Sequence, residues 1–90
     1  MTLMDLLASR DQWTDDNTIY LVRPWNRGAE AMLVSPSPDT TEPVIRLGIR
    51  YDYFLECFIV RDFIEDFLAS GERSDQEICE RLIRYAIYDA

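Results

Sequence analysis

Residues 52–80 are the most acidic and the most apolar part of this 90-residue chain, and any fold must accommodate both properties. The stretch holds nine of the seventeen acidic residues and two of the nine arginines. Its local charge is therefore −7, close to the −8 of the whole chain. The sequence accommodates both properties by placing apolar and acidic side chains on opposite faces of a helix.

Two helices are predicted in the C-terminal half. The first runs from about Phe58 to Ser70 and Gly71, which end it. The second is capped by Ser74, with Glu77 three residues on, and continues to about Tyr88. The predicted inward residues of the first helix are Val60, Phe63, Ile64, Phe67 and Leu68, and those of the second are Ile78, Cys79, Leu82, Ile83, Tyr85 and Ala86.

The N-terminal half predicts a short helix and β-strands. Residues 3–9 form the helix, with Thr2 as its cap. Residues 18–22 and 30–34 are β-prone and predict an antiparallel hairpin, followed by a loop over 35–43. In the β-rich run 44–56, Gly48 marks either a bulge or a break between two short strands.

These elements predict an α+β fold over one domain, residues 1–90. A small antiparallel sheet of three or four strands packs against the two C-terminal helices, and a short helix precedes it.

The amino-acid inventory excludes most catalytic chemistry. The chain has no His and no Lys, which removes the Ser-His-Asp, Cys-His and Schiff-base arrangements as well as histidine metal sites. Its three glycines are too far apart to form a phosphate-binding loop. Cys57 and Cys79 have neither a redox nor a zinc spacing, and we expect them to be buried and unpaired. We therefore expect a protein that is not an enzyme and holds no cofactor.

Carboxylate chemistry is the alternative that the inventory leaves open. Asp62, Glu65 and Asp66 are oxygen ligands of the kind that Mg²⁺ and Ca²⁺ prefer, and two acids can act as general acid and base. The stretch lacks a glycine-turned loop of alternating ligands, so we expect a solvated helix face and no metal site.

The charge and the hydropathy pattern restrict partners and compartment. No run of about eighteen apolar residues is present and the N-terminus does not resemble a signal peptide, so we expect a cytoplasmic protein without membrane association. The net negative charge disfavours direct binding of nucleic acid. We expect Arg23, Arg27, Arg46 and Arg50 to pair with acids of the helices.

Asp62, Glu65 and Asp66 are spaced to repel one another on one helix face. In the last helix, by contrast, Glu77 and Glu80 each precede an arginine by four residues, Arg81 and Arg84. Two explanations fit the unbalanced face: it keeps a small domain soluble, or it meets a basic partner. The residues predicted to bind such a partner are Asp62, Glu65, Asp66, Glu56, Glu72 and Trp25.

Residues 51–90 resemble a small acidic bacterial family of about this length. The run YDYFLECFIVRDFIEDFLAS, followed by a capped helix ending in RLIRYAIYDA, is similar to the β-α-α ending of that family, which closes with aromatic residues and an acid, as Tyr85, Tyr88 and Asp89 do here. In size and charge the chain also resembles the immunity partners of bacterial polymorphic toxins. The resemblance implies no active-site residues.

We therefore expect an immunity or antitoxin type of inhibitor that covers a basic partner such as a nuclease toxin. Two alternatives remain: an inhibitor from a phage or mobile element that mimics DNA, and a small structural module that dimerises. The sequence allows either a monomer or a homodimer.

Overall fold

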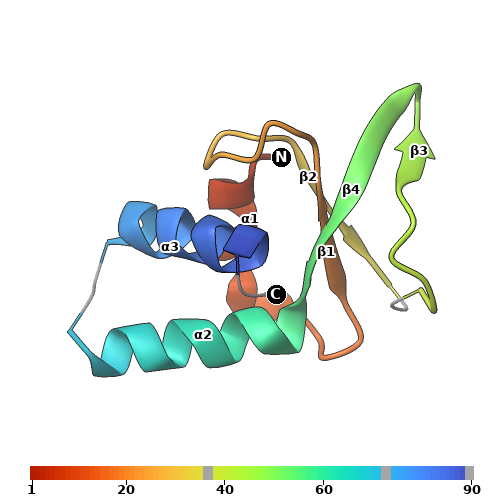
Figure 1. The fold of residues 1–90 in the computed structure, drawn as a ribbon. Helices are drawn as coiled ribbons and strands as arrows, with labels where there is room; N and C mark the ends of the chain where they lie inside the picture. The colour runs from red at the N-terminus through yellow and green to blue at the C-terminus, as the bar shows by residue number, and fades with distance from the viewer. Residues whose placement is uncertain (36–37, 72–73, 89–90) are drawn as a thin grey trace.

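The computed structural model describes residues 1–35, 38–71 and 74–88. The order of elements is α1 (Leu3–Ala8), the 3-10 helix η1 (Arg10–Gln12), β1 (Thr18–Leu21), β2 (Ala31–Val34), β3 (Val44–Arg46), β4 (Ile49–Glu56), α2 (Cys57–Ala69) and α3 (Asp75–Tyr88). The strands form one antiparallel sheet in the order β2-β1-β4-β3. The helices gather on one side of the sheet, and the β3–β4 hairpin extends away from them (Figure 1). The predicted α+β fold is confirmed.

Strand β1 lies inside the sheet, and all four of its residues are buried. It pairs with β2 as the predicted hairpin requires and with β4 on its other side. Ile19 lies opposite Leu55 and Tyr20 opposite Tyr53, so Phe54 is an extra residue at a β-bulge. The bulge allows Phe54 and Leu55, although adjacent, both to be buried in the core.

Gly48 belongs to a tight turn between two strands, which confirms the second of the two predicted alternatives. Arg46 of β3 lies opposite Ile49 of β4, and only Leu47 and Gly48 connect them. Their φ angles are +54° and +77°, as in the type I′ turn that matches the twist of a two-residue hairpin.

Helix α2 follows β4 without an intervening loop. Glu56 is its extended N-cap residue and its side chain makes no cap hydrogen bond. The N–H of Cys57 instead donates to the carbonyl oxygen of Asn17 at 3.0 Å. Of the predicted inward residues, Val60, Ile64 and Phe67 are buried and Phe63 is half-buried, whereas Leu68, in the last turn, is 44% exposed.

Helix α3 completes the core by packing against α1 and α2. The Oγ of Ser74 accepts from the N–H of Glu77 at 3.4 Å, as the predicted cap requires. Cys79 is fully buried in α3 and Cys57 in α2, and both are unpaired thiols, as predicted. The buried residues that α3 contributes are Ile78, Cys79, Leu82 and Ile83.

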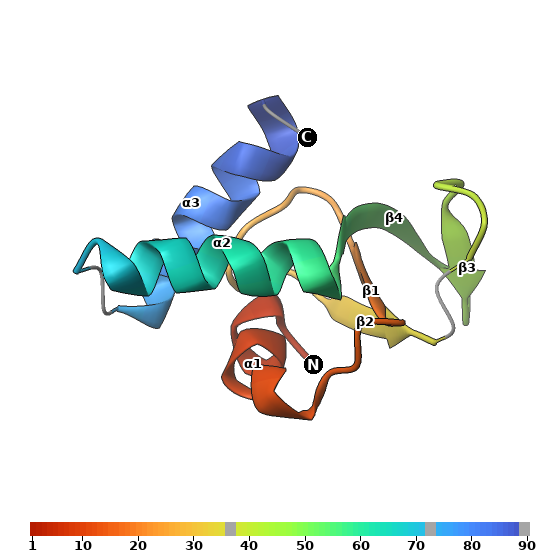
Figure 2. The ribbon, with the colours of Figure 1, turned by 90° about the horizontal axis from the view of Figure 1, so that it is seen from below.

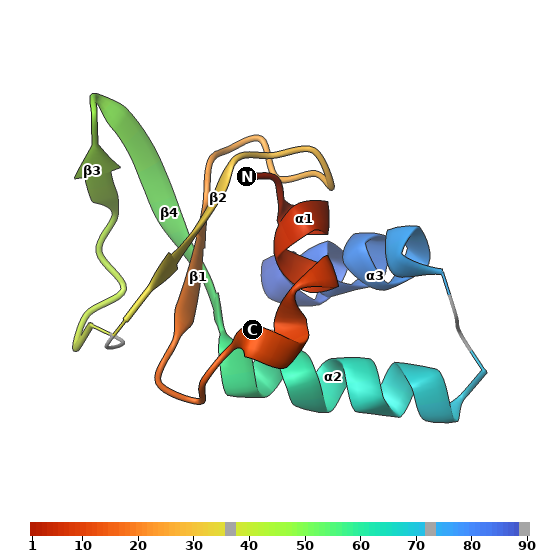
Figure 3. The same cartoon turned by 180° about the vertical axis from the view of Figure 1, so that it is seen from behind.

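The N-terminal segment is fixed to the connection between β1 and β2 (Figure 3). The N–H of Leu3 donates to the carbonyl oxygen of Ala29 at 3.0 Å, and the terminal ammonium lies 2.7 Å from a carboxylate oxygen of Glu30. Thr2 and Asp5 form a capping box at the start of α1. Helix α1 is therefore held by contacts at its first turn, although it is only six residues long.

Candidate partner-binding face

The three acids that the sequence singled out lie together on the exposed side of α2. Asp62, Glu65 and Asp66 are all exposed. Among the residues that the structure describes, no ion pair involves any of them. Other acids do have a basic group within 4 Å, namely Asp15, Glu30, Asp52, Asp75 and Glu80. We call Asp62, Glu65 and Asp66 the acidic face.

Arg61, the nearest base in the sequence, turns away from the acidic face. Its guanidinium donates to the carbonyl oxygens of Arg10, at 2.8 Å, and of Trp13, and it lies 3.4 Å from a carboxylate oxygen of Asp15. Those groups belong to the segment between α1 and β1. Arg61 therefore joins α2 to that segment and leaves Glu65 without a neutralising partner.

Exposed apolar side chains adjoin the acids on α2. Phe58, one turn before Asp62, is 46% exposed, and Leu68, three residues after Glu65, is 44% exposed. In Figure 2 the helix lies at the front of the molecule, with neither α1 nor α3 in front of it. Acidic and apolar side chains are therefore both exposed along this side of α2.

Two shallow hollows flank the acidic face. One, of about 420 Å³, is lined by Glu65 together with Arg10, Arg61 and Leu68. The other, of about 260 Å³, is lined by Asp66 together with Arg81. They lie on either side of α2, so a partner that covers the helix also reaches both.

The other predicted partner residues do not join the acidic face. Glu56 is half-buried at the start of α2, where it accepts from the hydroxyl of Tyr53 at 3.0 Å. Burial, and secondarily this bond to Glu56, raises the pKa of Tyr53 to about 12. Glu72 lies outside the described residues.

Trp25 lies in a different part of the molecule. Its ring meets Phe54 edge-on at 5.1 Å, and its Nε1 donates to the carbonyl oxygen of Leu21 at 3.3 Å. The half-buried ring also lines a hollow of about 260 Å³ with Arg27 and with Glu80 of α3. The structure therefore gives Trp25 a packing role beside α3, apart from the acids of α2.

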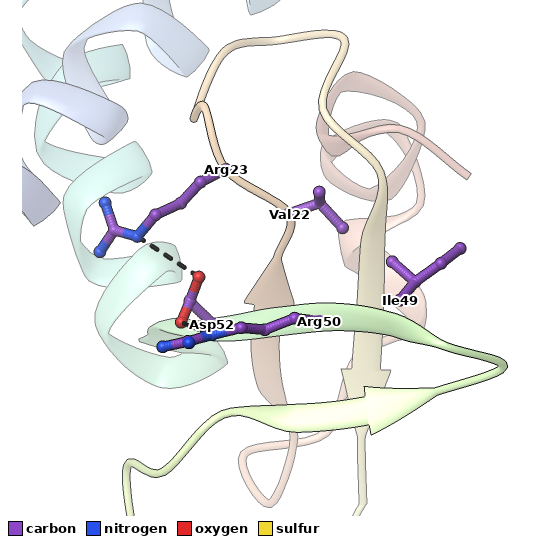
Figure 4. Close-up of a pocket in the computed structure, with 5 residues that line it drawn as sticks. All are labelled: Val22, Arg23, Ile49, Arg50 and Asp52. Carbon is purple, nitrogen blue, oxygen red and sulfur yellow. Dashed lines mark hydrogen bonds and ion pairs between the residues drawn. The ribbon is translucent and has the colours of Figure 1, made fainter.

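The arginines of the N-terminal half pair differently from the prediction. Arg27 does pair with a helix acid, since its Nη1 lies 3.9 Å from Glu80 of α3. Arg23 and Arg50 instead both contact Asp52 of β4, at 3.3 and 3.1 Å (Figure 4). For these two arginines the prediction was wrong, because the sheet brings a strand acid closer than any helix acid.

The Asp52 cluster is the arrangement that sequence reasoning missed. The cluster consists of Arg23, Arg50 and Asp52, which with Val22 and Ile49 line a hollow of about 490 Å³ (Figure 4). A signal was available for Arg50 and Asp52, since residues two apart on a strand share a face. Arg23 follows the last residue of β1 by two positions, and its place depends on the pairing of β1 with β4.

Neither a metal site nor a membrane span is found in the ranges 1–35, 38–71 and 74–88. No group of three or more Cys, Asp or Glu side chains there is arranged to hold a metal ion. None of the helices in those ranges has the length and apolar character needed to cross a membrane.

Comparison of the chain with protein-family models, with curated proteins and with solved structures gave no match.

Proposed function

We propose that this protein is a non-enzymatic inhibitor of the immunity or antitoxin type, which uses its acidic face to cover a basic partner such as a nuclease toxin. The observation that carries the proposal is the absence of any ion pair at Asp62, Glu65 and Asp66 among the described residues. The neighbouring base, Arg61, is directed toward the segment between α1 and β1. We also propose a cytoplasmic location, which suits two buried thiols that form no disulfide.

The acidic face is unfavourable for the isolated chain. Like charges three and four residues apart on a helix destabilise it by about 0.2–0.5 kcal/mol per pair. A basic partner reverses the sign of this contribution, and complementary charge also raises the association rate. The exposed Phe58 and Leu68, which lie before and after the acids on α2, add apolar area to such an interface.

A mimic of DNA is less well supported. That function needs carboxylates that follow the spacing of duplex phosphates along one surface. Exposed acids here also lie outside α2, at Asp39 and Glu42 in the connection between β2 and β3.

The proposal is tested by capture of partners from the native host on immobilised protein, at low and at high salt. The wild type is expected to retain a basic protein at low salt and to release it as the salt rises. The variant D62R/D66R is expected to lose the capture.

The matched control is D39R/E42R, which changes the net charge by the same amount on residues outside α2. It is expected to capture the partner as the wild type does. Equal losses in both double variants would mean that only net charge matters. Capture that resists high salt, or that survives in D62R/D66R, would refute the proposal.

A further inference from the structure

The Asp52 cluster carries a net positive charge in a chain whose net charge is −8. Arg23 and Arg50 both contact Asp52 through Nε, at 3.3 and 3.1 Å, so one acid stands against two bases. The side chain of Asp52 is only 15% exposed, whereas those of Arg23 and Arg50 are 62% and 65% exposed. Exposed ion pairs add little to stability, so folding alone does not account for a second arginine at this acid.

The contacts of the cluster hold both guanidiniums in place. One carboxylate oxygen of Asp52 accepts from Nε of Arg50, and the other lies against Nε of Arg23. The guanidinium of Arg23 also lies over the ring of Trp25, with its Cζ 4.1 Å from the ring centroid. That ring is itself held by its edge-on contact with Phe54. Less side-chain freedom is therefore lost when a ligand binds to the two guanidiniums.

The outer edges of both guanidiniums are able to bind an anion. Each arginine approaches Asp52 with its Nε, and within the described residues the Nη atoms of Arg23 and Arg50 donate no hydrogen bond. Arginine forks bind carboxylate and phosphate oxygens. One guanidinium can satisfy both oxygens of a carboxylate, whereas a phosphoryl group offers three oxygens and can accept from two guanidiniums at once. The pair of arginines therefore favours a phosphoryl group over a carboxylate.

The hollow beside the guanidiniums also has an apolar part. Its volume of about 490 Å³ lies within the range of about 300–1,000 Å³ that is usual for sites of small ligands. Val22 and Ile49 line the hollow with the charged residues, and in Figure 4 they lie to one side of the two guanidiniums. Ile49 is 45% exposed, so an apolar group bound there would remove it from water. The lining thus suits a ligand that joins an anionic group to an apolar one.

We propose that the Asp52 cluster binds a phosphate monoester of a small organic molecule. The phosphoryl group lies between Arg23 and Arg50, and the organic part lies against Val22 and Ile49. The net charge of −8 opposes the many phosphates of a nucleic acid, whereas a single phosphoryl group is governed by the charges nearest to it. The cluster belongs to β4 and to the segment after β1, and the acidic face belongs to α2. The inference therefore does not depend on the proposed function.

The proposal is tested by NMR titration of the nitrogen-15-labelled full chain at constant ionic strength, with phenyl phosphate, inorganic phosphate and benzoate. Phenyl phosphate is expected to shift the amide signals of residues 22–25 and 49–52 in a saturable way. It should bind at least about fivefold more tightly than inorganic phosphate, which has no apolar part. It should bind at least about tenfold more tightly than benzoate, which has the ring but carries a carboxylate.

Arg23→Gln and Arg50→Gln each remove one guanidinium and are expected to weaken the binding of phenyl phosphate at least about tenfold. The matched control is Arg46→Gln, because Arg46 is exposed on the same hairpin as Arg50 but does not line the hollow. R46Q makes the same change in net charge and is expected to bind within about twofold of the wild type.

Equal losses of affinity in R50Q and R46Q would overturn the proposal, as would the absence of saturable shifts at the residues that line the hollow. Benzoate or inorganic phosphate that binds as tightly as phenyl phosphate would also overturn it, since the first would remove the preference for a phosphoryl group and the second the role of the apolar part.

Discussion

At the scale of single residues, Arg61 decides the electrostatic character of α2. It precedes Glu65 by one helical turn, a spacing at which an arginine and a glutamate can pair. The structure places its guanidinium on the carbonyl oxygens of Arg10 and Trp13. Backbone carbonyls that lose water on folding need a donor, and the forked guanidinium can serve both. The unbalanced charge of the acidic face follows from this demand of the backbone.

Arg61→Ala is therefore expected to lower the free energy of unfolding by about 1–2 kcal/mol, because the carbonyl of Trp13 loses its donor and that of Arg10 keeps only the N–H of Trp13. The control is Arg84→Ala on the exposed side of α3, for which a change within about 0.5 kcal/mol is expected. Urea unfolding followed by Trp fluorescence measures both. Equal midpoints for the two variants would show that the contacts of Arg61 contribute nothing.

Some residues could not be placed from the sequence for physical reasons. Gly48 predicted either a bulge or a break in the β-rich run, and nothing in the residue type of Leu47 predicted its positive φ. The burial of both Phe54 and Leu55 contradicts the alternation of a regular strand, since it depends on a bulge set by pairing with β1.

At the scale of elements, the periodicity of the helices was sufficient to predict both α2 and α3. A helical face is a local property, and its apolar residues are the same whatever they pack against. The prediction that Leu68 faces inward was wrong, because burial depends on what packs against the helix. Leu68 lies in the final turn of α2, after its last buried residue, Phe67. The acidic face could be predicted because it too follows from the helical period of the sequence. The place of Trp25 beside α3 could not, because it depends on tertiary contacts.

The acidic face is expected to lower the stability of the free protein while it favours binding of a basic partner. Asp62→Arg replaces two repulsions, with Glu65 and Asp66, by two attractions, and is expected to raise the free energy of unfolding by about 0.5–1 kcal/mol at low salt. The same variant is expected to weaken capture of the basic partner. Thermal unfolding at low and high salt measures the first effect, which screening should reduce. A less stable Asp62→Arg protein would instead show that Asp62 has a structural role.

At the scale of the whole molecule, two surfaces differ in chemistry. The acidic face lies on α2, and the hairpin tip carries apolar side chains with Arg46 and Arg50. The molecule is elongated, with extents of 39 × 24 × 24 Å, and the hairpin extends away from the helices (Figure 1). A basic partner that covers the acidic face would therefore leave the hairpin tip uncovered.

The core between these surfaces contains groups that must stay neutral. Burial raises the pKa of the Cys57 thiol from 9.0 to about 12, with Arg61 opposing the shift, and that of Cys79 to about 11. An acid whose pKa is higher in the folded than in the unfolded state favours folding below its unfolded pKa. That contribution is lost as the pH rises toward the folded pKa.

Stability is therefore expected to be nearly constant between pH 7 and 8.5 and to fall as the pH rises from 9.0 toward 11, since the thiols of the unfolded chain then ionise while those of the core cannot. Each thiol contributes a slope of about 1 kcal/mol per pH unit in this window. Tyr53 adds to the loss above its ordinary pKa of 10.0, because its folded value is about 12. Urea midpoints at a series of pH values measure the slope.

The double variant C57A/C79A is less stable throughout because of the cavities it creates, but its slope between pH 9 and 10 should be markedly smaller. An unchanged slope in that variant would assign the alkaline loss to other groups and would mean that the two thiols are not shielded from water in the folded chain.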